Sequence, residues 1–127
     1  MNLLLLPYAF NTIILVPIGL MTLFGGERGG QLACQGKFPE SVGFRTILGS
    51  LWTAILIGSL LGIFFPVSMS PLLLLQVIYK AIWLSVFVLP RLLSGDNREI
   101  PSGITLSFFL IVVSYPWIIP WNLLFGP

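Results

Sequence analysis

The sequence predicts an all-α integral membrane protein, on three grounds. Hydrophobic residues make up 57% of the 127 residues and charged residues only 8%, whereas a soluble surface needs far more charge. Apolar stretches of about 20 residues, the length that crosses a bilayer as a helix, recur along the chain. Most charged residues gather between these stretches. We therefore expect a single transmembrane domain over residues 1–127, in contact with the lipid bilayer.

Four transmembrane helices with proline kinks are expected. They cover residues 3–24, 41–65, 70–90 and 102–124. Pro17 cannot donate a hydrogen bond inside the first helix, so we expect a bend there. The end of the last stretch contains Pro116 and Pro120 beside Trp117 and Trp121, residues that suit a kinked segment at headgroup level. The alternative is three spans, with one terminal segment along the membrane interface.

The two charged segments predict the orientation. Gly25–Glu40 is rich in glycine and is expected to be an irregular loop, and Arg91–Ser102 is a second loop on the same side. Five basic residues fall on that side: Arg28, Lys37, Arg45, Arg91 and Arg98. The other side has no lysine or arginine. The positive-inside rule places the charged loops in the cytoplasm or stroma, and both termini outside or in the lumen.

The composition argues against several classes of function. The chain has no histidine and one cysteine, Cys34, so we expect no metal site and no internal disulfide. A net charge of +2 without a basic patch argues against nucleic acid. The acidic residues are confined to loops, and Ser85 lies about 140° around the helix from Lys80, too far for a dyad. We therefore expect no enzymatic activity and no catalytic residues.

Lys80 is the most informative residue, because an ammonium at the centre of a membrane helix costs a few kcal/mol or more. Gln76 lies one turn earlier on the same face, and Asn11 is a second polar residue inside a span. Trp83 and Tyr79 form an adjoining aromatic face, suited either to helix packing or to a pigment or partner. Lys80 either bonds within its own bundle, pairs with a polar group of a neighbouring subunit or pigment, or is uncharged. We favour the second of these.

A stripe of small residues at four-residue spacing runs along the second span. It consists of Ser50, Ala54, Gly58 and Gly62. Small residues at this spacing let helix backbones approach closely in lipid, so the stripe is expected to face another helix or a flat ligand.

The second and third spans, GSLWTAILIGSLLGIFFP followed by LLLLQVIYKAIWLSVFVLP, resemble small multi-span bacterial membrane proteins. In size and build the chain also resembles the extra small photosystem I subunit of a chlorophyll d-using cyanobacterium. That resemblance implies photosynthesis in a thylakoid membrane, with chlorophyll or carotenoid as neighbours. Without histidine, chlorophyll magnesium would need Asn, Gln, a carbonyl or water as its ligand.

Two functions follow as expectations. The first is a non-catalytic accessory subunit at the periphery of a larger membrane complex, with other membrane subunits as partners. The alternative is a small homo-oligomeric transporter or channel whose central site is Lys80.

Overall fold

The computed structural model describes residues 3–37, 41–95, 98 and 100–126, and throughout these ranges the regular elements are helices. Three helices are long and apolar enough to cross a membrane, as expected for an all-α membrane protein. They are α1 (Leu5–Phe24), α3 (Val42–Phe64) and the continuous helix Ser70–Ser94. A fourth apolar helix, Ser102–Trp117, is shorter.

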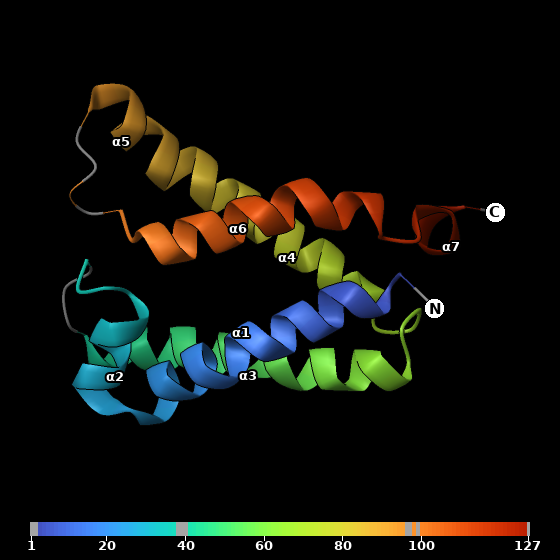
Figure 1. Ribbon diagram of the computed structural model, residues 1–127, viewed down its shortest axis with the longest axis horizontal. Coiled ribbons are helices and arrows are strands. Elements are labelled where there is room, and N and C mark those ends of the chain that lie inside the picture. The colour runs from blue at the N-terminus through green and yellow to red at the C-terminus, as the bar shows by residue number, and fades with distance from the viewer. Residues whose placement is uncertain (1–2, 38–40, 96–97, 99, 127) are drawn as a thin grey trace.

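The bundle consists of two helix pairs (Figure 1). Helix α1 packs along α3, and α4 (Ser70–Trp83) packs along α6 (Ser102–Ser114). Two apolar clusters join the pairs. One contains Leu4, Tyr8, Leu73, Ile111, Tyr115 and Ile119, and the other contains Leu15, Ala33, Trp52, Ile55, Leu56 and Phe108. Each cluster draws side chains from both pairs, so the core lies along the line where the pairs meet.

The bounds of α1 and α3 agree with the first two predicted helices to within two residues at each end. The side chain of Ser41 accepts a hydrogen bond from the Phe44 amide over 3.3 Å and caps the start of α3. Glycines let the two helices touch: a Cβ built on Gly49 would meet the Leu23 backbone at 2.7 Å. Helix α1 continues through Pro17 as a single element.

The third span is longer than predicted and changes its winding. Helix α4 is followed by a π-helical turn, η1 (Leu84–Val88), and then by α5 (Leu89–Ser94). Pro90 has no amide hydrogen and its ring crowds the preceding turn, and a wider π turn there relieves the crowding. The helix ends at Gly95, whose φ of +80° suits glycine.

The fourth predicted span, residues 102–124, is interrupted in its last part, where the sequence predicted a kinked segment. Helix α6 passes into a 3-10 turn, η2 (Tyr115–Trp117), and a separate short helix, α7 (Trp121–Phe125), follows. Pro120 cannot donate to the carbonyl of Pro116, and the indole Nε1–H of Trp121 donates to that carbonyl instead, over 2.7 Å. The proline pair therefore ends the helix.

The prediction of an irregular loop over residues 25–40 was wrong in its first half, which forms α2 (Gly26–Ala33). Residues 38–40 lie outside the described ranges. A Cβ built on Gly29 would collide with the carbonyl of Met21. The glycines therefore serve close packing of α2 against the end of α1.

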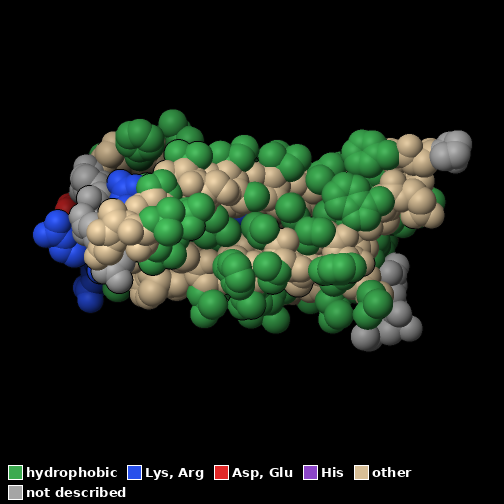
Figure 2. Space-filling view, turned by 90° about the horizontal axis from the view of Figure 1, so that it is seen from above, with side chains coloured by type: hydrophobic (Ala, Val, Ile, Leu, Met, Phe, Trp, Pro, Cys, Tyr) green, Lys and Arg blue, Asp and Glu red, His purple; other side chains and the backbone are tan. Residues whose placement is uncertain are grey.

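The charged side chains gather at one end of the bundle (Figure 2). Helix α2 and the turn after α5 lie there, whereas α1 begins and α7 ends at the opposite end (Figure 1). The two charged segments therefore share one end.

Candidate functional site

A buried polar network joins four helical elements around Asn11. The Asn11 amide donates to Ser59 Oγ over 3.0 Å and to Gln76 Oε1 over 2.7 Å. Its oxygen accepts from Gln76 Nε2 over 3.3 Å and from the Tyr115 hydroxyl over 2.5 Å. A side-chain amide offers two donor hydrogens and two acceptor lone pairs. Asn11 thus uses its full hydrogen-bonding capacity inside the chain.

Two tyrosines extend the network toward the end of the bundle where α1 begins. The hydroxyl of Tyr8 donates to the carbonyl of Pro66 over 2.6 Å, and that of Tyr115 also lies 3.0 Å from the carbonyl of Pro7. Sequence reasoning missed Tyr8, Tyr115 and Ser59. The signal available was the presence of hydrogen-bonding side chains inside apolar spans, where an unsatisfied polar group is costly.

Lys80 lies one turn further along α4 and is only 3% exposed. Its Nζ lies 4.8 Å from the ring centroid of Phe108 and 5.2 Å from that of Tyr79, distances that favour a cation–π contact. Glu27 in α2 is the one acidic residue that the structure describes, and no ion pair joins it to Lys80. The chain itself encloses most of the amine, and the expected pairing of Lys80 with a group from a neighbouring subunit or pigment stays a prediction.

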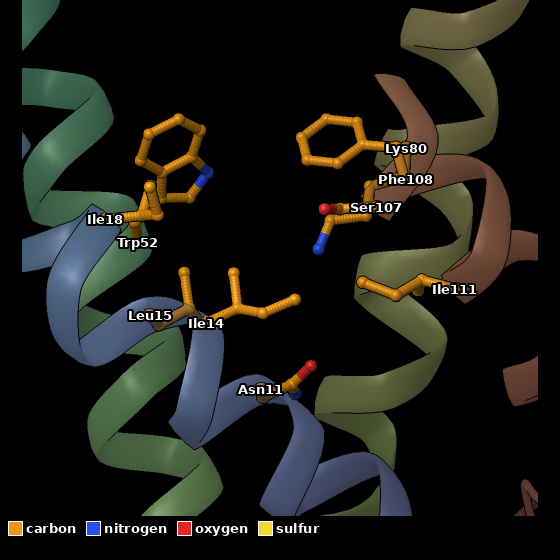
Figure 3. Close-up of a pocket in the computed structure, with 9 residues that line it drawn as sticks. All are labelled: Asn11, Ile14, Leu15, Ile18, Trp52, Lys80, Ser107, Phe108 and Ile111. Carbon is orange, nitrogen blue, oxygen red and sulfur yellow. The ribbon is translucent and has the colours of Figure 1, made fainter. Parts of the chain in front are cut away.

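The amine of Lys80 points into a small cavity between the two helix pairs (Figure 3). The cavity measures about 30 Å³, and a buried water needs roughly 10–15 Å³ of such volume. Its lining consists of Asn11, Ile14, Leu15, Ile18, Trp52, Lys80, Ser107, Phe108 and Ile111. A chlorophyll or carotenoid does not fit in this space. Gln76 and Lys80 share a face of α4 as predicted, and Asn11 lies beside them, but the interior that they face has no room for a pigment.

Trp83 belongs to an aromatic cluster beside the cavity. Its ring stacks on Phe87 at a centroid distance of 5.3 Å and meets the edge of Phe108 at 5.2 Å. Tyr79 packs against the other side of Phe108 at 5.8 Å. Trp83 therefore supports the ring that faces Lys80 and does not itself line the cavity.

The small-residue stripe of α3 is divided between two environments. Gly62 packs against the ring of Tyr8, and Gly58 packs against the side chain of Leu72. Ser50 and Ala54 are exposed on the outer surface of α3. The stripe as a whole does not face another helix of this chain, because the α1–α3 contact follows Gly49 and Gly62, which do not share the four-residue spacing.

A larger groove opens between η1–α5 and α6, with a volume of about 680 Å³. Its lining is mainly apolar but includes the small or hydroxylated residues Ala81, Ser85, Ser102 and Thr105. The Thr105 hydroxyl oxygen is buried and has no hydrogen-bond partner among the residues that the structure describes.

Cys34, which follows α2, is 7% exposed, and burial raises the pKa of its thiol. Among the residues that the structure describes, no group of three or more His, Cys, Asp or Glu side chains is placed to hold a metal ion. No protein-family model, no curated protein and no solved structure matches the chain.

Proposed function

We propose that the chain is a non-catalytic accessory subunit that packs at the periphery of a larger membrane complex. The observation that supports this proposal is the open groove between η1–α5 and α6. A pocket of about 300–1,000 Å³ is of the size that binding sites use. The Asn11 network is satisfied internally, whereas the groove is open to a partner.

The occupant that best suits the groove is a transmembrane helix of another subunit. The walls carry Ala81, Ser85 and Thr105, and small or hydroxylated residues are typical of helix–helix contacts in lipid. The unbonded hydroxyl of Thr105 needs a polar partner, which a helix supplies through a side chain or carbonyl and a lipid tail does not. A photosystem I-type complex in a thylakoid membrane is the finer form of this proposal, with pigments on the outer surface. In it the charged end faces the stroma.

Purification in a mild detergent tests the proposal. The tagged chain is expected to migrate on a native gel with a large complex, and Ser85→Leu, which fills the groove, is expected to release it as a free subunit. Ser114→Leu is the matched control, because Ser114 is exposed on α6 outside the groove. A wild-type chain that migrates alone, or equal behaviour of the two variants, would contradict the proposal. Chlorophyll absorbance in the large complex tests its photosynthetic form.

The second candidate function is a small homo-oligomeric transporter or channel, which is favoured by the Lys80 amine facing a cavity. If the chain is a transporter or channel, it is expected to form a homo-oligomer in detergent and to support solute flux into reconstituted vesicles. Lys80→Met keeps much of the bulk of the stem and removes the charge. It is expected to abolish flux without changing assembly, and unchanged flux would contradict the carrier reading.

A further inference from the structure

A groove between α1 and α6 continues the cavity beside Lys80 toward the charged end of the bundle. This groove measures about 450 Å³ and reaches from Gln35 and Gly103 inward. It shares three lining residues with the cavity, Ile14, Ile18 and Ser107. The two hollows are thus adjacent, and these three side chains line both of them. Movement of these side chains would give water at the charged end a short route to the Lys80 amine.

The surroundings of the Lys80 amine favour a bound negative charge. The faces of Phe108 and Tyr79 contact one side of the amine and stabilise its charged form. An ammonium has three donor hydrogens and no acceptor, and the described chain offers Lys80 no carboxylate and no hydrogen bond. A buried charge needs a partner of opposite sign. None of the residues that the structure describes supplies that partner, and a small ion from outside the chain can.

The size of the cavity restricts the partner. A volume of about 30 Å³ holds two or three waters at roughly 10–15 Å³ each. An organic carboxylate, a phosphate ester or a pigment is too large. The lining away from Lys80 is mostly apolar, with Ile14, Leu15, Ile18 and Ile111, and this suits a weakly hydrated monatomic anion.

We propose that the cavity beside Lys80 is a binding site for one halide-sized monovalent anion, reached from the charged end through the groove between α1 and α6. The anion supplies the counter-charge of the ammonium in the low-dielectric interior. Trp52 and Phe108 line the cavity but not the groove. This site is independent of whether the chain docks onto a larger complex, since it lies inside the chain.

Thermal unfolding of the purified chain in detergent tests the site. Sodium bromide is titrated against sodium gluconate at constant ionic strength, because gluconate is too large for the cavity. A ligand that binds the folded state raises the melting temperature with its concentration. We expect a saturable rise with bromide for the parent chain and no rise for Lys80→Met. Lys37→Met, which removes an exposed charge, is the control and is expected to keep the full rise.

A second variant keeps the test decisive if Lys80→Met does not fold. Ser107→Leu narrows the junction of the two hollows and leaves Lys80 in place, and it costs only a hydrogen bond to Gly103 within α6. It is expected to lose the bromide-dependent rise. A parent chain that shows no saturable rise holds water alone, and the proposal is then overturned. An equal rise in Lys80→Met or in Ser107→Leu also overturns it.

Discussion

Asn11 and Gln76 exchange hydrogen bonds through their side-chain amides, 65 residues apart in sequence and on different helices. This reciprocal pair fixes the rotation of α1 against α4, because a turn of either helix breaks both bonds. The pair also lies one helical turn from Lys80, so it holds the wall of the Lys80 cavity in place. The position of the cavity wall therefore depends on the hydrogen bonds between Asn11 and Gln76.

The Asn11–Gln76 pair predicts non-additive effects on stability. Asn11→Leu leaves the amide of Gln76 and the hydroxyl of Tyr115 without their partner, and we expect a loss of about 2 kcal/mol in the free energy of unfolding. Adding Gln76→Met removes the stranded amide. The double variant is then expected to lose about 1 kcal/mol less than the sum of the single variants. Reversible unfolding in detergent measures all three values.

Tyr115→Phe is the companion variant for this cycle. It removes one hydroxyl that approaches Asn11 Oδ1 and the Pro7 carbonyl but leaves the amide pair intact. We expect a loss of about 1 kcal/mol, near the usual value for a hydrogen bond between membrane helices. Strict additivity of Asn11→Leu and Gln76→Met would show that the two amides do not interact in the folded chain.

The glycines of α3 predict a graded response to alanine. A Cβ on Gly62 would collide with the ring of Tyr8, and one on Gly49 would meet the Leu23 backbone, so each alanine is expected to cost about 1–3 kcal/mol. On Gly58 the nearest atom is the flexible end of Leu72, so alanine should be nearly neutral. Gly43→Ala, in an open part of the helix, should gain up to about 1 kcal/mol.

The same unfolding measurement ranks these four variants side by side. If Gly62→Ala and Gly43→Ala have the same effect, then the close contact of α1 and α3 at Tyr8 is not formed. From the four-residue spacing alone, Gly58→Ala and Gly62→Ala would be expected to cost the same stability. The structure predicts a larger cost for Gly62→Ala.

The sequence predicted the helical membrane class well because length and hydropathy are local properties. Residues 42–64 form a helix almost where their composition placed it. The burial of Asn11, Gln76 and Lys80 also has a sequence signal, because polar residues inside apolar spans gather away from lipid.

Other features depend on three-dimensional contacts and had no local signal. Helix α2 forms because Gly29 can approach the carbonyl of Met21, a contact that glycine content alone does not distinguish from a flexible loop. Helix α6 ends early because of Pro116 and Pro120, but the number of residues lost depends on the indole of Trp121. Which small residues of α3 meet α1 depends on helix rotation, which a repeat of Ser50 and Ala54 does not reveal.

Cys34 predicts slow labelling by thiol reagents from either side of the membrane. The thiol is buried, and burial raises its pKa, so less of the reactive thiolate is present at a given pH. We expect alkylation to be much slower than for a cysteine placed at the exposed Ser94, measured by mass shift in detergent. Rates that are equal would contradict the burial of Cys34.

Burial of the Cys34 thiol also predicts how the stability of the folded chain changes with pH. A raised pKa in the folded state means that the neutral thiol is favoured there, so this contribution to stability is present below the ordinary thiol pKa. It is lost as the pH rises through the ordinary value toward the folded-state value. The parent chain is therefore expected to lose stability in mildly alkaline solution relative to Cys34→Ala. A parent chain and a Cys34→Ala variant with parallel pH profiles would show that the thiol is not buried.

Ser94→Cys also tests the orientation of the bundle. The charged end is expected to face the cytoplasm or stroma, so an impermeant thiol reagent should label Ser94→Cys only after the membrane is opened. A cysteine at the exposed Asn122, in α7 at the opposite end, should react in intact cells or right-side-out vesicles. Labelling of the two positions in the reverse order would invert the proposed topology.

Gln35 predicts how the mouth of the groove between α1 and α6 is held. Its side-chain oxygen accepts a hydrogen bond from the Gly103 amide over 2.8 Å, at the start of α6, and thereby joins the segment after α2 to α6. Gln35 has a φ of +56°, a left-handed conformation that is equally unfavourable for glutamine, alanine and glutamate.

Gln35→Ala keeps that backbone cost and removes the acceptor, so we expect a loss of about 1 kcal/mol in the free energy of unfolding, the usual cost of losing a helix cap. Gln35→Glu keeps the acceptor and adds a negative charge beside a helix N-terminus, which is expected to restore or exceed the parent stability by about 0.3–1 kcal/mol. Unfolding in detergent distinguishes the two, and hydrogen exchange at Gly103 should be faster in Gln35→Ala alone. If both variants match the parent in stability and in exchange at Gly103, Gln35 does not hold α6, and the mouth of the groove is set by packing of Leu32 and Ile104 instead.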